Sequence, residues 1–400
     1  MIRRHLLGLA AAVALPGIAL AQQQQPAPPA WAQGRPAEMA SSPLAPHAPR
    51  LTVTPPDRIP VNSLRVPEGF QVELWAHGLP GARAMTRGPN GTVFVGTRGI
   101  GRVYAVRDNG QAREVSTLMS GLDQPSGVAV RDGALFIAAM HRVLRIDNVE
   151  NNLQNPQPTD LTSAFGQAAE PHHGWKHIAF GPDGRLYIPR GVPCNICEVP
   201  EDRFALIESW NPDGSDRRIE ARGVRNSVGF DFHPRTGQLW FSNHGRDWAG
   251  NNNPSDTLHV SLRRGENHGF PWCAGGFQDP AVEGRLCSEF PPPALILGPH
   301  VAPIGTHFYT GTAFPEQYRN ALFVALRGSW NRAPLSGFEV IVVREGENGR
   351  LVRESFLTGF RDDANQRFSG RPAGLLTMPD GSLLVSDEDN GAIYRVSYRR

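Results

Sequence analysis

One short pattern recurs six times along this chain: a tight turn, followed directly by a short apolar strand. The turns contain glycine, aspartate or asparagine, the residues that adopt tight turn geometry most readily. The copies are Asn90-Gly91 before TVFVGT, Asp132-Gly133 before ALFIAA, Asp183-Gly184 before RLYIPR, Thr236-Gly237 before QLWFSN, Asn320 before ALFVAL and Asp380-Gly381 before SLLVSD. Repetition of one hairpin unit every 40 residues or more is typical of small antiparallel sheets arranged around an axis. The sequence therefore predicts an all-β fold, a six-bladed β-propeller.

One interval between copies is much longer than the others. The stretch from Gly237 to Asn320 contains GRDWAGNNNPSD and GENHGFPWC, which are rich in turn-forming and polar residues. Loop insertions of this kind usually gather on the face of a fold that carries function. A pair of ordinary β-sandwiches is the alternative architecture, and the regular copies disfavour it.

The N-terminal 50 residues differ in composition from the rest of the chain. Residues 1–21 resemble a secretion signal: Arg3 and Arg4 precede an apolar stretch that ends in a small-residue cleavage site. That stretch is too short to span a membrane comfortably. Residues 22–50, rich in Gln, Pro and Ala, predict a flexible linker, and residues 51–400 predict one propeller domain. We expect a periplasmic or secreted protein without a membrane span.

The four cysteines predict two disulfides, since an even number in an exported protein favours pairing. Proximity favours Cys194–Cys197 and Cys273–Cys287, although the sequence alone allows three pairings. Cys194 and Cys197 also match a redox pair or half of a zinc site. Cys273 and Cys287 lack the spacing of a second zinc-binding pair, so we favour disulfides.

The net charge gives no sign of a nucleic-acid or anionic-membrane partner. Removal of residues 1–21 takes away Arg3 and Arg4 and leaves basic and acidic side chains in balance. A neutral chain gives no support for binding to nucleic acid or to an anionic membrane.

Polar clusters recur where strands are expected to meet loops. They are HHGWKH (172–177), GVRNSVGF (223–230), NHGRD (243–247), GPHVAPIGTHFYTG (298–311), LRGSWNR (326–332) and SGRPAG (369–374). Loops of successive propeller blades converge around the central channel, so these clusters are expected to face one pocket. Arginine forks with histidine and tryptophan would suit a flat, polyanionic ligand. Taken singly, each cluster has a purely structural interpretation as turn or scaffold.

From about residue 65 to 398 the chain resembles the soluble aldose dehydrogenases that depend on pyrroloquinoline quinone (PQQ), and most closely the L-sorbosone dehydrogenase-like branch. The segments that carry the resemblance are HHGWKHIAFGPDGRLYI, GVRNSVGFDFHP, GENHGFPWC, PHVAPIGTHFYTG, LFVALRGSWNR and GRPAGLLTMPDGSLLVSD. The family implies a six-bladed propeller that binds PQQ and calcium on its loop face.

The resemblance also implies roles for individual residues. His173 matches the general base, while Arg225 and Asn226 match a pair beside the reactive quinone carbonyl. Three further positions are implied to contact the cofactor: His300, where the family has a threonine, Arg371, which matches an anchoring arginine, and Arg327, near an anchoring lysine. Gly245 and Arg246 fall where backbone carbonyls hold calcium. Lys176, the only lysine of the chain, is a further candidate, because its compact ammonium could pair with a cofactor carboxylate; chance survival is the alternative.

Several positions depart from the glucose-oxidising branch. His172 and Val192 stand where that branch has acidic residues, Ala373 replaces a second anchoring arginine, and Asp256-Thr257 replaces an acidic pair. These differences argue against glucose itself as the substrate.

The expected function is therefore oxidation of a sugar or aldehyde at its anomeric or aldehyde carbon, by hydride transfer to PQQ. His173 would take the hydroxyl proton, because the pKa of a free histidine is near neutral. Calcium and Arg225 would stabilise charge on the quinone oxygen. Electrons would pass to a quinone or cytochrome partner. The alternatives are a non-catalytic propeller that binds glycans or a protein, and a metal-dependent lactonase.

Overall fold

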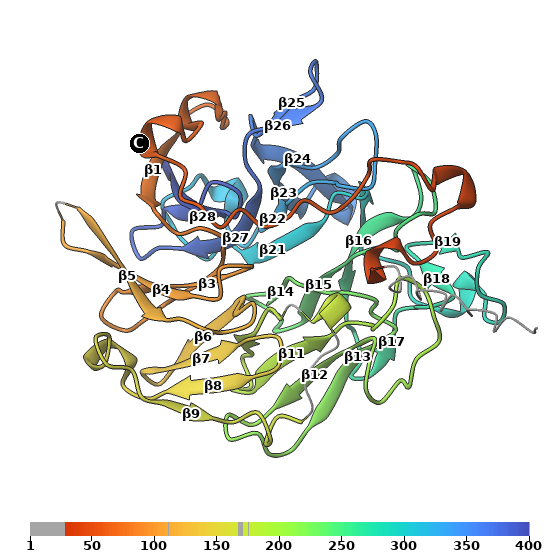
Figure 1. The fold of residues 1–400 in the computed structure, drawn as a ribbon, viewed down its shortest axis with the longest axis horizontal. Coiled ribbons are helices and arrows are strands. Elements are labelled where there is room, and N and C mark those ends of the chain that lie inside the picture. The colour runs from red at the N-terminus through yellow and green to blue at the C-terminus, as the bar shows by residue number, and fades with distance from the viewer. Residues whose placement is uncertain (1–28, 111, 167–170, 175, 400) are drawn as a thin grey trace, which may run out of the picture.

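The computed structural model describes residues 29–110, 112–166, 171–174 and 176–399. The expected signal peptide and the first residues of the expected linker lie outside this part of the chain. The described residues form six sheets of four or five strands around a common axis (Figure 1). The predicted six-bladed β-propeller is confirmed.

The four main strands of each blade are antiparallel to their neighbours, and in five of the blades they occur in chain order. The first two blades comprise β2 (Ala82–Arg87), β3 (Val93–Thr97), β4 (Val103–Asp108), β5 (Arg113–Met119), and β6 (Gly127–Arg131), β7 (Ala134–Ala138), β8 (Val143–Ile146), β9 (Pro158–Asp160). The next two comprise β10 (Ala179–Phe180), β11 (Leu186–Arg190), β12 (Leu206–Trp210), β13 (Arg218–Arg222), and β14 (Phe230–Phe232), β15 (Leu239–Asn243), β16 (Ser255–Val260), β20 (Leu295–Pro299).

The last two blades comprise β21 (Pro303–Phe308), β22 (Leu322–Leu326), β23 (Glu339–Glu345), β24 (Leu351–Leu357), and β27 (Pro372–Thr377), β28 (Leu383–Asp387), β29 (Ala392–Tyr398), β1 (Phe70–His77). The sixth blade is thus completed by the first strand of the chain. β1 pairs with β29 in antiparallel register from Phe70 opposite Tyr398 to His77 opposite Ala392. This pairing closes the ring, because the two strands come from opposite ends of the propeller sequence.

The repeated turn-and-strand pattern marks the second strand of every blade. Its six copies contain β3, β7, β11, β15, β22 and β28. Nearly all residues of these strands are buried, since blades pack on both of their faces. Each preceding turn has a glycine or asparagine with positive φ, for example Gly91 (103°) and Asn320 (60°), because these residues adopt this conformation most readily.

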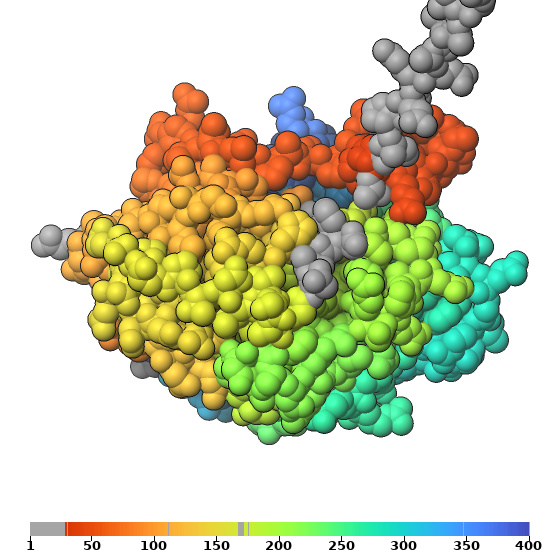
Figure 2. All heavy atoms as spheres, turned by 60° about the horizontal axis from the view of Figure 1, so that its bottom comes forward, coloured from red at the N-terminus to blue at the C-terminus, as the bar shows by residue number. Residues whose placement is uncertain are grey.

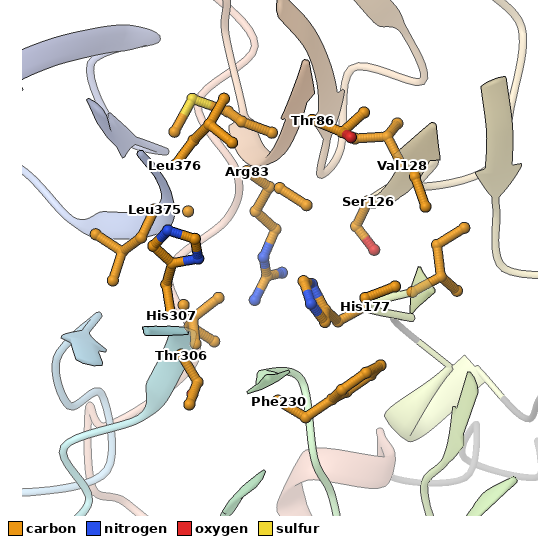
Figure 3. A pocket seen from close by; sticks show the side chains of 18 of the residues that line it. Arg83, Thr86, Ser126, Val128, His177, Phe230, Thr306, His307, Leu375 and Leu376 are labelled. Atoms are coloured by element: carbon orange, nitrogen blue, oxygen red, sulfur yellow. The ribbon is translucent and has the colours of Figure 1, made fainter. Parts of the chain in front are cut away.

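The first strands of the six blades surround a central channel. A cavity of about 230 Å³ in this channel is lined by residues of β2, β6, β10, β14, β21 and β27. Arg83, His177 and His307 converge on it, together with apolar side chains such as Leu375 (Figure 3). The channel is therefore partly polar, and it brings all six blades together at one place.

The long insertion between the fourth and fifth copies of the pattern leaves the blades. It adds β17 (Glu266–Asn267), which pairs in parallel with β13, and a small hairpin of β18 (Cys273–Ala274) and β19 (Phe277–Gln278). The only other short hairpin in the described chain consists of β25 (Arg361–Asp362) and β26 (Arg367–Phe368). Both predicted disulfides, Cys194–Cys197 and Cys273–Cys287, are present and no cysteine is free.

Helices are confined to single 3-10 turns. They are η1 (Ala30–Ala32), η2 (Ala37–Met39), η3 (Pro56–Arg58), η4 (Val61–Ser63), η5 (Val149–Asn151), η6 (Pro171–His173), η7 (Cys287–Glu289), η8 (Glu316–Tyr318) and η9 (Glu347–Gly349). In the described part of the chain, no helix is long and apolar enough to cross a bilayer.

The segment 29–50 differs from the expected flexible linker. It crosses one face of the propeller as a band, from beside β16 to the region of β1 (Figures 1 and 2). Trp31 packs against Trp248 and Trp330, and Gln33 bonds Asn195. Composition averaged over 22–50 concealed this docking, because it depends on a few individual residues such as Trp31, His47 and Pro49. The domain boundary at residue 51 stays a prediction.

The Cys273–Cys287 disulfide is expected to stabilise the insertion. The replacement of both cysteines by serine should lower Tm by roughly 5 °C, because a loop of this length contributes about 3 kcal/mol in the entropic model. Differential scanning calorimetry measures this change. The matched Cys194→Ser/Cys197→Ser variant, whose loop closes over a separation of 3 rather than 14 residues, should lose less. The reverse order of Tm values would contradict this account.

Candidate active site

A cavity of about 360 Å³ lies at the loop end of the central channel. It shares Arg83, Val228 and Ile304 with the channel cavity, so the two are neighbours along the axis. Its lining is dominated by cationic, imidazole and indole side chains. They are Trp31, His47, Arg83, Arg98, His172, His173, Arg225, His244, His300, Arg327 and Trp330, with Asn226, Asn331, Asp247 and Asp256 among them.

Three arginines of the lining surround one buried carboxylate. Glu388, which follows β28, accepts hydrogen bonds from Arg327 (2.8 and 3.1 Å) and Arg98 (3.1 Å), and Arg83 lies 3.6 Å away. Burial opposes the ionisation of Glu388, yet the three guanidinium groups outweigh it and hold its pKa well below the usual value. Burial lowers the pKa of Arg83 to about 10, so it stays charged at neutral pH. Three positive charges against one negative charge leave a cationic wall, which suits an anionic ligand.

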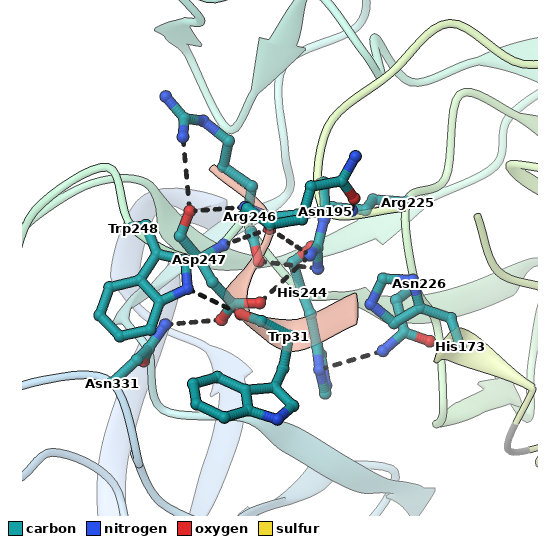
Figure 4. A network of polar contacts seen from close by, with 12 residues as sticks. Trp31, His173, Asn195, Arg225, Asn226, His244, Arg246, Asp247, Trp248 and Asn331 are labelled. Carbon is teal, nitrogen blue, oxygen red and sulfur yellow. Dashed lines mark hydrogen bonds and ion pairs between the residues drawn. The ribbon is translucent and has the colours of Figure 1, made fainter. Parts of the chain in front are cut away.

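Arg225 is held rigidly on another side of the cavity. Its guanidinium donates to the Asn195 backbone and side-chain oxygens (both 2.9 Å) and to the Gly245 carbonyl (2.9 Å), and it lies 3.4 Å from an Asp247 oxygen (Figure 4). Burial lowers the pKa of Arg225, and Asp247 opposes this effect. Four fixed contacts leave the side chain little rotational freedom, so its charge is preorganised.

Asn226 presents an oxygen atom that has no partner among the described residues. His244 donates through Nε2 to the Pro303 carbonyl (2.8 Å), so its Nδ1 accepts from the Asn226 amide at 3.4 Å. The amide orientation is thereby fixed, and Asn226 Oδ1 is buried without a hydrogen bond. Buried polar atoms normally find partners, so this atom marks a place where a ligand group would bind.

The surroundings of His173 determine which ring nitrogen carries the proton. Nδ1 donates to the Val192 carbonyl (2.6 Å), so the proton of the neutral ring resides on Nδ1 and Nε2 is the basic atom. Burial, followed by Arg225 and His172, lowers the pKa of His173 well below 6.5. The ring is therefore unprotonated at neutral pH, which is the state that a general base requires.

His172 lies against His173 but in a different environment. Their ring centroids are 4.0 Å apart in an edge-to-face arrangement. His172 Nε2 is buried without a partner among the described residues, and burial lowers its pKa to about 4. The neighbouring histidine is thus neutral as well, and it does not supply the negative charge of the missing acidic residue.

The structure brings most of the predicted site residues together. His173, Arg225, Asn226, Gly245, His300 and Arg327 all line the cavity. His300 adopts a positive φ of 57° and donates to the Gly250 carbonyl (2.8 Å), which holds its ring in the wall.

Lys176 does not belong to this cavity. It lines the central channel instead, where its ammonium donates to the carbonyl oxygens of Ala139 (3.2 Å), Met140 (2.8 Å) and Gly174 (3.3 Å). Burial lowers its pKa to about 7. Three carbonyl acceptors already use the three donors of the ammonium, so Lys176 ties neighbouring loops together and the expected contact with a cofactor carboxylate is not supported.

Arg371 and the side chain of Arg246 also lie outside the lining. Arg371 donates to the Gly328 carbonyl (2.9 Å) and stacks on Phe368 and Phe338, with centroid distances of 4.2 and 4.9 Å. It thus supports the loop of Arg327 from behind rather than facing the cavity. The Arg246 guanidinium forms an ion pair with Asp279 (2.6 Å) beside the cavity. The metal-binding role expected of its backbone carbonyl stays a prediction.

Sequence reasoning missed the arginine cluster and the contribution of the N-terminal segment. Arg83 and Arg98 are single arginines in ordinary strand and turn contexts, and Glu388 follows a strand that was assigned only a structural role. His47 and Trp31 come from a segment expected to be a linker. Trp31 was the available signal, because it is the only aromatic residue of Phe, Trp or Tyr type between residues 22 and 50.

Comparison with known proteins places the chain in a family. A family model described as TrAA12-like matches residues 277–399. A protein of Borreliella burgdorferi, described as uncharacterized, is 32% identical over 357 residues, which cover 85% of this chain and 92% of the relative. The chain belongs to the same family as this relative.

The resemblance to PQQ-dependent sugar dehydrogenases is confirmed as well. A PQQ-dependent pyranose dehydrogenase of Coprinopsis cinerea is 32% identical over 120 residues, which span 26% of this chain and 16% of that enzyme. The holo form of its PQQ domain shares the fold, with a TM-score of 0.71 and 21% identity over 84% of this chain and 97% of that one. The calcium structure of a Trichoderma reesei carbohydrate-active enzyme of family AA12 has a TM-score of 0.70 and 20% identity, with the same coverage. The L-sorbosone dehydrogenase-like branch stays a prediction.

Buried neutral histidines should make the protein sensitive to mild acid. Burial lowers the pKa of His172, His177 and His268 to about 4, and those of His173 and His259 well below 6.5. The unfolded chain therefore binds protons more readily, so stability is full above pH 6.5 and is lost as pH falls from 6.5 toward 4. Asp247 and Asp387, whose pKa values burial raises, act in the opposite sense but are fewer.

We expect Tm to fall by at least about 5 °C between pH 7 and pH 5, measured by calorimetry at constant ionic strength. In His268→Phe the decline should be shallower. This substitution removes one buried imidazole whose two nitrogens have no partner among the described residues. A Tm that is independent of pH over this range would contradict the assignment of neutral buried histidines.

Proposed function

We propose that this protein is a PQQ- and calcium-dependent dehydrogenase that oxidises a sugar or sugar aldehyde at its anomeric or aldehyde carbon. The observation that carries the proposal is one cavity that combines a cationic wall, an unpartnered amide oxygen and a histidine whose basic atom is Nε2. The relatives support it, since those of stated function are PQQ-dependent sugar dehydrogenases.

The residues present fit a quinone with three carboxylates. The excess positive charge of Arg83, Arg98 and Arg327 around Glu388 lies at the cavity surface and would hold carboxylate groups. Asn226 follows Arg225 in the sequence, and both line the same cavity as these arginines. When bound, the quinone supplies the carbonyl carbon that accepts hydride.

The protein alone offers few free oxygen ligands for a calcium ion in this cavity. Gly245 and Asp247 line the cavity and offer a carbonyl and a carboxylate, the oxygen ligands that calcium prefers. Both already accept hydrogen bonds from Arg225, and both Asp256 oxygens accept from backbone amides. Among the described residues no cluster of three or more acidic, histidine or cysteine side chains could hold a metal alone. A calcium ion here would therefore need oxygens of the cofactor as further ligands.

His173 performs the proton chemistry in this proposal. Oxidation of a hydroxyl-bearing carbon removes one hydride and one proton. Nε2 takes the hydroxyl proton, and the Val192 carbonyl keeps the ring in the required tautomer through Nδ1. The depressed pKa of His173 reflects burial beside Arg225, and negative charge from a bound tricarboxylate would raise it toward neutral pH, where a base works best.

In this proposal Arg225 stabilises negative charge that develops on the ligand, and it exchanges no proton. Its contacts with Asn195, Gly245 and Asp247 fix the guanidinium before any ligand binds. A fixed positive group favours negative charge that develops beside it, and it needs no reorganisation during the reaction.

The setting agrees with an exported enzyme. Two disulfides in the described chain are typical of an oxidising compartment, which supports a periplasmic or secreted location. Electrons would leave to a quinone or cytochrome acceptor. A glycan-binding propeller remains the second candidate, because indoles line the cavity. A metal-dependent lactonase would need a cluster of carboxylates as metal ligands, and the described residues contain no such cluster.

Cofactor uptake tests the proposal directly. Apoprotein treated with a chelator should take up PQQ stoichiometrically only when calcium is added. Its stability should then rise, by about 2.7 kcal/mol at a ligand concentration 100 times Kd. Spectrophotometric titration and thermal melting measure both effects. Arg327→Ala should weaken PQQ binding about tenfold or more, whereas Arg107→Ala, which breaks an exposed ion pair with Glu114, should not. Failure of the wild-type protein to bind PQQ with calcium would favour the glycan-binding candidate.

Alanine substitutions of His173 and His172 should differ in their effect on turnover, measured with a dye-linked assay of sugars and aldehydes. His173→Ala should lower kcat by roughly 100-fold or more, as expected for loss of a positioned base, while calcium-dependent PQQ binding persists. His172→Ala should cost much less. Loss of PQQ binding in both variants would mean that the pair is structural. Loss of turnover in His172→Ala alone would reverse the assignment.

A further inference from the structure

Residues 29–50, called here the strap, cross the active-site cavity from one side to the other. They lie as a band on the face of the propeller (Figure 2). The strap contributes Trp31 near its beginning and Pro46 and His47 near its end to the cavity lining. The cavity is therefore built from the propeller and from a segment that precedes it.

The first end of the strap is attached to the loops that hold Arg225. The Trp248 indole donates to the Trp31 carbonyl (2.7 Å), and Arg35 stacks on the Trp248 ring at 5.1 Å. The Asn195 backbone amide donates to Gln33 Oε1, and its side-chain amide donates to the Gln33 carbonyl, both at 2.9 Å. Because Asn195 also accepts from Arg225, one residue connects the strap to Arg225.

The other end is attached to different blades. His47 packs edge-to-face on Phe368, with centroids 5.0 Å apart. Pro49 packs so closely on Gly99 that a β-carbon there would lie 2.5 Å from it. Arg50 approaches Asp389 at 3.7 Å. Attachments at both ends hold the strap across the cavity as a fixed wall.

Trp31 is the side chain that this wall presents beside Trp330. The two indoles meet edge-to-face with centroids 5.8 Å apart, and Trp248, which is buried, supports Trp31 at 6.5 Å. Next to them Asn331 donates to Asp247 at 2.5 Å. The cavity lining therefore includes an indole surface with amide and carboxylate groups beside it as well as the arginines around Glu388, so the lining has a cationic part and an aromatic part.

These two parts suit two different ligands. The arginine cluster is suited to carboxylates, whereas an indole face suits a sugar ring, because one face of a pyranose consists largely of C–H bonds that pack on aromatic surface. Amide and carboxylate groups at the edge of the indoles would accept and donate hydrogen bonds to sugar hydroxyls. Trp31 supplies one of the two indoles that line the cavity, and Trp330 supplies the other.

We propose that Trp31 forms part of the substrate-binding wall, so that the strap as well as the propeller determines which sugars are accepted. This inference rests on the proposed function, since it assigns the substrate side of the same cavity. It makes Trp31 a residue that contacts the sugar and sets KM, whereas the arginine cluster sets cofactor affinity.

Substitution of Trp31 tests the assignment in the full-length chain. Trp31→Ala should raise KM for sugars about tenfold, as expected when an aromatic contact worth roughly 1.4 kcal/mol is lost. Its kcat and its affinity for PQQ should each stay within about twofold of wild type. Trp31→Phe keeps an aromatic face and should restore KM to within about threefold. Glu38→Ala, an exposed position of the strap, is the matched control and should leave all three quantities unchanged.

A binding measurement separates this inference from the proposed function. Methyl pyranosides lack a free anomeric hydroxyl and bind without turnover, so calorimetry can follow them on both apoprotein and PQQ-loaded protein. Weaker binding of methyl pyranosides to Trp31→Ala, with recovery in Trp31→Phe, would support a substrate-binding role of Trp31, whether it is seen in the apoprotein or in the PQQ-loaded protein. Unchanged KM and glycoside affinity in Trp31→Ala would overturn the proposal, as would a loss confined to PQQ affinity. Failure of the wild-type protein to bind PQQ would instead contradict the proposed function.

Discussion

The site depends on one buried carboxylate. Glu388 comes from the sixth blade, and the arginines around it come from the first blade and the fifth. Removal of these charges from water is costly, and the cost is met only because each guanidinium lies within 4 Å of the carboxylate. The cluster therefore fixes the relative positions of three blades at the mouth of the channel. The same cluster leaves an excess of positive charge, so one arrangement supports both the ring and the binding of an anion.

A second constraint concerns the histidine pair. The acidic residues of the glucose-oxidising branch are replaced by His172 and Val192 in this chain. The Val192 backbone carbonyl accepts a hydrogen bond from His173 Nδ1. A carbonyl dipole fixes the tautomer without a full negative charge, so it raises the basicity of the ring less than a carboxylate would. In the proposed mechanism, the negative charge of a bound tricarboxylate would raise the pKa of His173 toward neutral pH.

The fold was predictable from sequence because each blade repeats one local signal. A glycine or asparagine with positive φ precedes every buried second strand, and this requirement is visible in the letters themselves. Six site residues were also predictable, since motifs place them at strand ends that converge. Lys176 and Arg371 lie outside the cavity lining, because a motif gives the position of a backbone, whereas three carbonyl groups or two phenyl rings decide where a long side chain points. Glu388 and Arg83 belong to no recognisable motif. Their ion pair joins the sixth blade to the first, so the sequence did not indicate that they lie together.

The way the ring closes also determines when the site is completed. β1 finds its partner β29 at the far end of the chain, where Gln71 bonds Ser397 across 326 positions. Contacts between such distant segments form late, because most of the chain must already be ordered. The strap is separated from β1 by residues 51–69, and it contacts the loops of several blades, at Asn195, Trp248 and Trp330 near its beginning and at Phe368 and Asp389 near its end. The cavity is therefore complete only when these distant loops and the strap are in place together, so its assembly depends on the same long-range kind of contact that closes the ring.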